Sequence, residues 1–375
     1  MNNRIVYLLF CVIILYSCTS NKYETKDITG QWKFIKHESN QPQLDESDPE
    51  YIPDSGFEDY FVPGFHFINE KDVSYKIGFY RTNGKGRKDY LGTRTTYRII
   101  GDSLKMYHKA DGKWNAYKIL SLTKDTLKLV AGNGYDTYAK LTYQTDAIEH
   151  YDKIIMSSSG CYGSCPILSI SIDNAGTMLF SGIEYTDKTG LYKAQVSLQE
   201  FKNFEENFKQ SAIKDLKNHY AASWTDDQTI SVTFVRNDTI VKSVSDYGRH
   251  APTEFIWAYN DLSYLYLRKK LEKINASIPF YFFGDIYFAD KKHYYPMYES
   301  EVFFLFQELM MKATVSDQKF KPLYFTTDYF WEEGEKMYTD GRFYQIKLEN
   351  ETVLYDLGYN FITRNNIEQR KILKE

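Results

Sequence analysis

Between Ile28 and about Thr145 the sequence contains eight short runs that favour β-strands. In several of them apolar and polar residues alternate, as Leu104 and Met106 do with Ser103 and Lys105, which is the period of a strand with one wet face. The runs read QWKFIK, FHFI, VSYKIGFY, TTYRII, SLKMYH, AYKILSL, TLKLV and YAKLTY. Short turns separate them, so we expect an antiparallel meander that closes into a small barrel over residues 27–146.

The composition favours further β-structure in the rest of the chain. Aromatic residues make up 17% of the 375 residues, with 34 Tyr and 25 Phe, and such side chains suit pleated, half-buried surfaces. A chain of this length exceeds the usual size of one domain. The predicted fold class is therefore a β-rich multidomain protein, in which an N-terminal antiparallel barrel is followed by α+β domains.

The first strand carries a family resemblance. The stretch ITGQWKFI, followed by YRIIGDSLKMY and ILSLTKDTLKLV, resembles the small bacterial lipocalin-like domains, whose first strand contains Gly-x-Trp, here Gly30 and Trp32. The resemblance implies that Trp32 plugs the closed end and belongs to the core. Small barrels are either filled by side chains or enclose one ligand, so a small apolar ligand would bind at the barrel mouth.

An acidic segment follows the first strand. Residues Glu38 to Tyr60 contain eight acidic residues, three prolines and no Lys or Arg. Such a composition buries too little apolar surface to order itself, so a long mobile loop is expected over the barrel mouth. A calcium site is the alternative, although the spacing lacks the alternating ligands and the turn glycine of an EF-hand.

The N-terminus has the pattern of an export signal. Arg4 precedes an apolar run from Ile5 to Tyr16, which is about 18 Å of helix and too short for a bilayer core of about 30 Å. The sequence around Cys18 resembles the bacterial lipoprotein signal, which implies a signal peptide over residues 1–18, lipid on Cys18 and a tether over 19–26. We therefore expect a protein held to a membrane of the bacterial cell envelope by its N-terminal lipid.

A second domain is expected over residues 150–275. Ser197 and Glu200 form a capping-box pattern before Leu198, Phe201, Phe204 and Phe208, which fall at helical spacing and predict a core stripe. A hairpin is predicted from TISVTFV and TIVKSVS, and a second helix begins near Pro252 with a stripe of Phe255, Tyr259, Leu262 and Tyr266.

The last part of the chain, residues 279–375, is expected to be another α+β segment. FYFFGDIYF suggests a strand, Glu301 to Ala313 a helix with a broad apolar face, and Asp340-Gly341 a hairpin turn. The sequence leaves open whether this segment is a third domain or an extension of the second.

Cys161 and Cys165 admit three interpretations. In an oxidising compartment neighbouring thiols pair, and Gly163 provides the turn that a disulfide needs. A redox pair would need a helix N-terminus or a cation beside one thiol, whereas Pro166 and the alternating ILSISI predict a strand. A structural zinc site would need four ligands, and two are clustered. We expect the disulfide and keep a thiol-disulfide oxidoreductase as the alternative.

The same cysteines carry a second resemblance. CYGSCP, followed by LSISIDNAGTMLFSG, DDQTISVTF and RHAPTEF, resembles a bacterial envelope domain family of unknown function that is marked by Cys-Phe/Tyr-Gly-x-Cys-Pro. The resemblance spans Asp152 to Leu271. It implies a location in the cell envelope and assigns no role to any residue.

No other residues form a catalytic, cofactor or metal pattern. The seven histidines are scattered, and Asp226-Asp227 on an extended chain would point opposite ways. The net charge is −4 with no basic stripe, which argues against nucleic acid as a partner. The sequence thus predicts an envelope protein without a catalytic role that binds a small apolar ligand or another envelope protein. An inhibitor or sensor module is the further alternative.

Overall fold

The computed structural model describes residues 22–40, 62–82, 88–275, 286–328, 337–347 and 351–374. These residues form two compact units. The first contains residues 22–40 and those from Pro63 to Leu141, and the second contains Val62 and those from Thr142 onward. The segment expected to be a signal peptide, Cys18 and residues 41–61 of the acidic segment lie outside the described residues.

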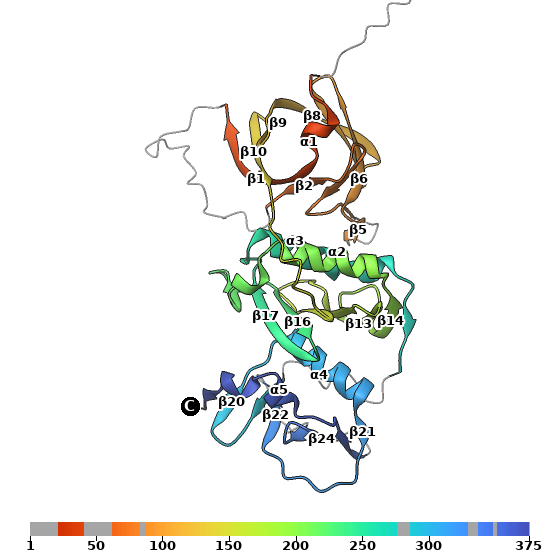
Figure 1. The fold of residues 1–375 in the computed structure, drawn as a ribbon, viewed down its shortest axis with the longest axis vertical. Coiled ribbons are helices and arrows are strands. Elements are labelled where there is room, and N and C mark those ends of the chain that lie inside the picture. The colour runs from red at the N-terminus through yellow and green to blue at the C-terminus, as the bar shows by residue number, and fades with distance from the viewer. Residues whose placement is uncertain are drawn as a thin grey trace, which may run out of the picture. The chain divides into compact units, whose positions relative to one another are not determined.

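The first unit is a closed antiparallel barrel of eight strands, which confirms the predicted fold class (Figure 1). Its strands follow one another as a meander in which β1 pairs with both β2 and β10. They are β1 (Gly30–Ser39), β2 (Gly64–Phe67), β3 (Asp72–Tyr75), β6 (Arg94–Ile100), β7 (Ser103–His108), β8 (Lys113–Leu122), β9 (Thr126–Ala131) and β10 (Gly134–Leu141). A separate hairpin joins β4 (Tyr80–Thr82) to β5 (Lys88–Tyr90).

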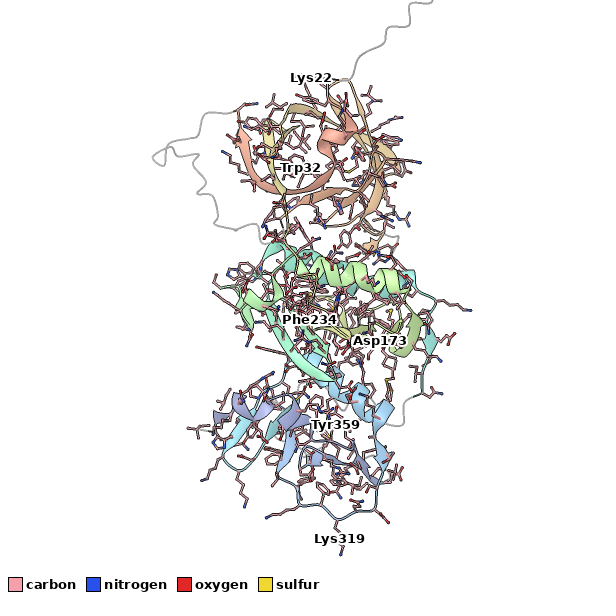
Figure 2. The ribbon with its side chains drawn as sticks, viewed as in Figure 1. Lys22, Trp32, Asp173, Phe234, Lys319 and Tyr359 are labelled. Carbon is pink, nitrogen blue, oxygen red and sulfur yellow. A yellow bond between two sulfur atoms is a disulfide. The ribbon has the colours of Figure 1, made fainter. Side chains whose placement is uncertain are left out.

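A short helix, α1 (Thr25–Ile28), precedes β1 in the chain and packs into the barrel core through Ile28. Trp32 is fully buried among the barrel side chains (Figure 2), and its Nε1 donates a 2.7 Å hydrogen bond to the carbonyl oxygen of Ile28. The last two residues of the tether expected over residues 19–26 lie in this helix, and residues 19–21 lie outside the described residues. The N–H of Lys22 donates to the carbonyl oxygen of Gly101.

The second unit contains two sheets of eight strands each. The first sheet has the order β15-β17-β16-β11-β12-β13-β14-β18 and is antiparallel except where β15 meets β17. Its strands are β11 (Lys153–Ser158), β12 (Ile167–Asp173), β13 (Thr177–Glu184), β14 (Gly190–Gln195), β15 (His219–Ala221), β16 (Thr229–Arg236), β17 (Thr239–Tyr247) and β18 (Glu272–Lys273). Two helices, α2 (Leu198–Lys209) and α3 (Thr253–Ser263), cover one face of this sheet (Figure 1).

The predicted helix signals of this region are present in the structure. Ser197 is the N-cap of α2, with the reciprocal hydrogen bonds to Glu200 that define a capping box, and Pro252 precedes α3. The prediction of the core stripe is wrong for one residue, because Leu198 is 58% exposed. It is the first residue of α2, one turn before the first side chain that reaches the core, Phe201.

The last part of the chain extends the second unit. Helix α4 (Glu299–Lys312) packs on β11 and β16, and thus on the face of the first sheet opposite to α2 and α3 (Figure 1). The second sheet, in the order β21-β25-β24-β23-β22-β19-β20-β26, shares one core with α4. It consists of β19 (Ile286–Ala289), β20 (His293–Tyr295), β21 (Thr314–Val315), β22 (Tyr324–Asp328), β23 (Met337–Thr339), β24 (Phe343–Lys347), β25 (Thr352–Asp356) and β26 (Ile372–Leu373), and α5 (Phe361–Arg364) lies beside it.

Helix α4 is buried on nearly all sides. Five consecutive residues, Val302 to Phe306, are at most 2% exposed, which is the pattern of a helix between two layers. Of the two possibilities that the sequence left open, this continuous core favours an extension of the second unit. Among the described residues, no helix is both long enough and apolar enough to cross a membrane.

Candidate functional site

The Cys161–Cys165 pair is a disulfide, as the sequence predicted. It closes the loop between β11 and β12, with the two α-carbons 5.7 Å apart. Gly163 has φ 154°, at the limit of the region that favours glycine, and its N–H donates a 2.8 Å hydrogen bond to the carbonyl oxygen of Cys161. No helix follows the second cysteine, because the chain continues through Pro166 into β12.

Hydrogen bonds hold this loop at both ends. Gln228 Nε2 donates to the carbonyl oxygens of Ser159 at 2.8 Å and Pro166 at 2.9 Å, so one side chain joins the residues before and after the disulfide. The N–H of Tyr162 donates to the carbonyl oxygen of Asp226 at 3.0 Å. The loop therefore has a fixed shape.

Tyr162 is the exposed side chain of this loop. Its accessibility is 89%, although the backbone on either side of it is fixed by the disulfide and by Asp226. Aromatic side chains presented on a rigid backbone lose little conformational entropy when a protein partner covers them.

A small pocket adjoins the loop. Its enclosed space is about 30 Å³, and the volume is about 390 Å³ when the space open to solvent is included. Its walls come from the end of β11, the start of β12, the residues that flank β16 and β17, and the C-terminal end of α3. The lining residues include Ser158, Pro166, Gln228, Arg249, Asn260 and Ser263.

Asn260 is the polar residue of the pocket whose hydrogen bonding is incomplete. It is 5% exposed, and its Nδ2 has no hydrogen-bond partner within the described part of the chain. An unpaired buried donor is costly, so it is an unusual feature in the wall of a pocket.

A buried carboxylate fixes the turn that carries Arg249. Asp246 is 0% exposed, and its Oδ1 accepts from the N–H groups of His250 at 2.7 Å and Ala251 at 3.0 Å. Its Oδ2 accepts from the hydroxyl of Tyr259 on α3 at 2.9 Å. Burial raises the pKa of Asp246, and these three hydrogen bonds oppose that rise. Arg249 itself has φ 59°, an uncommon conformation for a residue other than glycine.

A small apolar ligand was predicted at the mouth of the barrel, and side chains pack the barrel interior around Trp32. Trp32, Phe67 and Leu104 are 0% exposed, whereas a void wide enough for water would leave accessible surface on its walls. Aromatic rings also contact one another across the interior. The ring centroids of Phe65 and Tyr138 are 5.3 Å apart, and those of Phe67 and Tyr97 are 4.8 Å apart.

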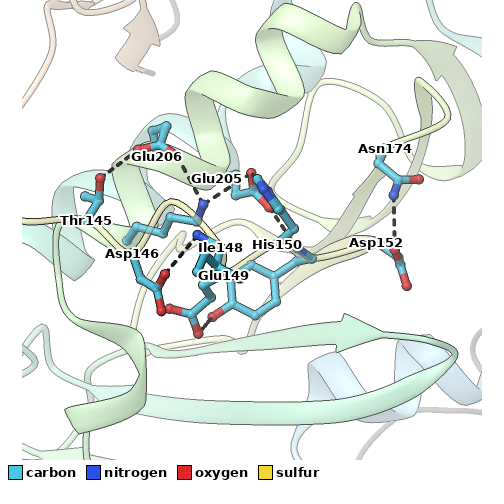
Figure 3. A network of polar contacts seen from close by, with 11 residues as sticks. Thr145, Asp146, Ile148, Glu149, His150, Asp152, Asn174, Glu205 and Glu206 are labelled. Carbon is cyan, nitrogen blue, oxygen red and sulfur yellow. Dashed lines mark hydrogen bonds and ion pairs between the residues drawn. The ribbon is translucent and has the colours of Figure 1, made fainter.

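A group of charged and polar side chains joins residues 145–152 to α2 (Figure 3). Glu205 accepts from the N–H of Tyr151 at 2.7 Å and lies 3.6 Å from the ammonium of Lys209, and both of these side chains are almost fully buried. These contacts attach residues 145–152 to α2, so we interpret this group of side chains as structural. Among the described residues, no group of three His, Cys, Asp or Glu side chains is placed to hold a metal ion.

The sequence identified the disulfide but missed the pocket beside it. In the sequence, Asp226-Asp227 is rejected as a catalytic pair, and RHAPTEF enters only as part of a resemblance. In the structure the segments containing them supply Gln228 and Arg249. The hydrogen-bonding capacity of a buried Asn such as Asn260 has no signal in a single sequence.

The comparisons with known proteins agree with one part of the sequence interpretation. Residues 152–266 match a family described as "Domain of unknown function (DUF6438)". The chain thus contains a DUF6438 domain, and the prediction of a domain of unknown function is confirmed. The matched residues include the disulfide, its loop and the pocket residues named above. No curated protein matches the sequence.

Proposed function

We propose that this protein is a lipid-anchored component of the bacterial cell envelope that binds another envelope protein and does so without catalysis. The anchor rests on the apolar run from Ile5 to Tyr16 and on the lipoprotein-like Cys18. A disulfide between Cys161 and Cys165 fits an oxidising compartment.

The observation that carries the binding function is the exposure of Tyr162. A tyrosine that is 89% exposed on a disulfide-closed, hydrogen-bonded loop has the character of an anchor in a protein interface. The packed interior of the barrel favours a protein partner over a small apolar ligand, because Trp32, Phe67 and Leu104 occupy that interior.

Photo-crosslinking in intact cells tests the binding function. The full chain would carry benzoylphenylalanine in place of Tyr162, and in a control in place of Tyr294, a tyrosine of β20 that is 39% exposed. We expect a discrete adduct from position 162 that is absent from position 294 and is lost in the Cys161→Ser/Cys165→Ser variant. Absence of the adduct, or the same adduct from both positions, would overturn the proposal.

Metabolic labelling tests the anchor separately. Radiolabelled palmitate should enter the wild-type protein and fail to enter Cys18→Ala, which should leave the membrane fraction. A wild-type protein that is soluble and unlabelled would contradict lipid anchoring without bearing on the role of Tyr162.

A further inference from the structure

The pocket beside the disulfide loop offers hydrogen-bonding groups that the protein itself does not use. Asn260 Nδ2 is a buried donor with no partner among the described residues. Gln228 uses both hydrogens of its Nε2 on the loop carbonyls, which leaves its Oε1 as an acceptor. A donor and an acceptor in one small pocket match the C=O and N–H of a peptide amide.

We propose that this pocket receives a backbone amide of the partner polypeptide. Its carbonyl oxygen would accept from Asn260 Nδ2, and its N–H would donate to Gln228 Oε1. The inference rests on the proposed binding function and names the chemical group that is recognised. It connects the pocket to Tyr162 through Gln228, because that residue lines the pocket and also holds both ends of the loop.

The charges around the pocket favour a neutral amide over a carboxylate. Arg249 brings one positive charge, and His250 lies in the same turn. Two carboxylates lie close by. Asp246 is buried beneath the turn, and Asp227 accepts from Gln228 N at 2.7 Å and from Trp224 Nε1 at 3.1 Å. With the acidic groups balancing the basic ones, the pocket has no excess positive charge to hold an anion.

The size of the pocket also fits one group of a longer chain. Its enclosed space is only about 30 Å³, so the pocket takes one small group and leaves the rest of the ligand outside. A polypeptide whose amide enters the pocket would continue over the adjacent loop, where Tyr162 is exposed. We therefore assign the loop and the pocket to one interface.

A titration with a model amide tests the chemistry of the pocket. The full chain would be labelled with nitrogen-15 at asparagine, and the side-chain signal of Asn260 identified as the one missing from Asn260→Asp. We expect N-methylacetamide to shift this signal saturably and sodium acetate, a carboxylate of similar size, to leave it unchanged. A shift with acetate alone, or with neither probe, would overturn the inference.

The crosslinking assay separates this inference from the proposed function. Asn260→Asp keeps the size of the side chain but replaces the donor by an acceptor, and should reduce the Tyr162 adduct about tenfold. Asn203→Asp makes the same change on the exposed side of α2 and should leave the adduct unchanged. Circular dichroism and thermal unfolding would verify that both variants fold.

The outcomes are distinguishable. If a folded Asn260→Asp protein gives the adduct in wild-type yield, the pocket is not part of the interface and this inference fails while the proposed function stands. If the wild-type protein gives no Tyr162-specific adduct, the proposed function itself fails.

Discussion

The hydroxyl of Tyr259 donates a 2.9 Å hydrogen bond to Oδ2 of Asp246, and both residues are buried. This bond joins β17 to α3. Together with the two backbone N–H groups that Oδ1 accepts, it positions the Arg249 turn against the helix that carries Asn260. The geometry of the candidate pocket therefore depends on a carboxylate that does not line it.

Removal of this carboxylate should destabilise the second unit strongly. Asp246→Ala leaves three donors without their acceptor, and two of them, the Ala251 N–H and the Tyr259 hydroxyl, are buried. An unsatisfied buried group costs about 1–3 kcal/mol, so we expect a loss of about 3 kcal/mol. Tyr259→Phe removes one hydrogen bond to a charged group and should cost about 1.5 kcal/mol. Urea unfolding measures both. Equal, small losses in the two variants would contradict the central role of Asp246.

The buried pair of Glu205 and Lys209 gives a second prediction. Glu205→Ala leaves a buried ammonium without its buried partner and the N–H of Tyr151 without an acceptor, so we expect a loss of about 3 kcal/mol in the free energy of unfolding. Glu206→Ala is the matched control, because that side chain is 49% exposed and also pairs with Lys209. The control should lose less than about 1 kcal/mol. Similar losses at the two positions would show that burial does not set the strength of this pair.

The disulfide should contribute modestly to stability and more to binding. It closes a loop of only five residues, for which the chain-entropy relation gives about 2 kcal/mol. Cys161→Ser/Cys165→Ser should therefore stay folded, with a small decrease in the urea midpoint, because Gln228 still bridges Ser159 and Pro166. Thiol titration under glutathione-like conditions should find the wild-type bridge intact. A bridge that opens readily there would favour the oxidoreductase alternative.

The barrel could be predicted from the sequence because each of its strands has one face toward the core and one face toward solvent. On β7, Leu104 and Met106 are buried while Ser103 and Lys105 are partly exposed, so the alternation in the sequence is the alternation in space. The strands are also joined in sequence order, which makes their neighbours local along the chain.

The first sheet of the second unit shows why the same signal was less informative there. Five serines lie in register across five strands on the face toward α4, and all of them are at most 4% exposed: Ser181, Ser169, Ser157, Ser231 and Ser245. The alternation of apolar and polar residues in ILSISI is the same whether the polar face of the strand is exposed to solvent or covered by another element. What covers it is α4, and Ser300 N donates to Ser231 Oγ at 3.0 Å. No local pattern specifies that contact.

Of the candidate site, only the disulfide could be predicted from the sequence. Cys161 and Cys165 are close in the sequence, whereas Gln228, Arg249 and Asn260 reach the pocket from segments more than 60 residues away. Their proximity results from the pairing of β11 with β16 and from the packing of α3 on the sheet. Both are tertiary events that a single sequence does not encode in any short motif.

The last prediction concerns His66 on β2 of the barrel. Burial, together with the nearby charges of Lys76 and Arg94, lowers its pKa to about 4. In the unfolded chain a histidine titrates near 6.5, so between these two values the unfolded state binds more protons than the folded state. The stability that His66 contributes is therefore complete above about pH 6.5 and decreases as the pH falls toward 4.

Hydrogen exchange of the full chain measures this dependence for the barrel alone. Protection of peptides from β1 and β2 should decrease from pH 7 to pH 4 after correction for the intrinsic exchange rate, and His66→Gln should decrease less over the same range. His219→Gln, at an exposed position on β15, controls for the loss of a histidine elsewhere and should follow the wild type. Because carboxylates also titrate in this range, the informative quantity is the difference between the wild type and His66→Gln. A difference that does not change with pH would mean that His66 is protonated equally in the folded and unfolded states.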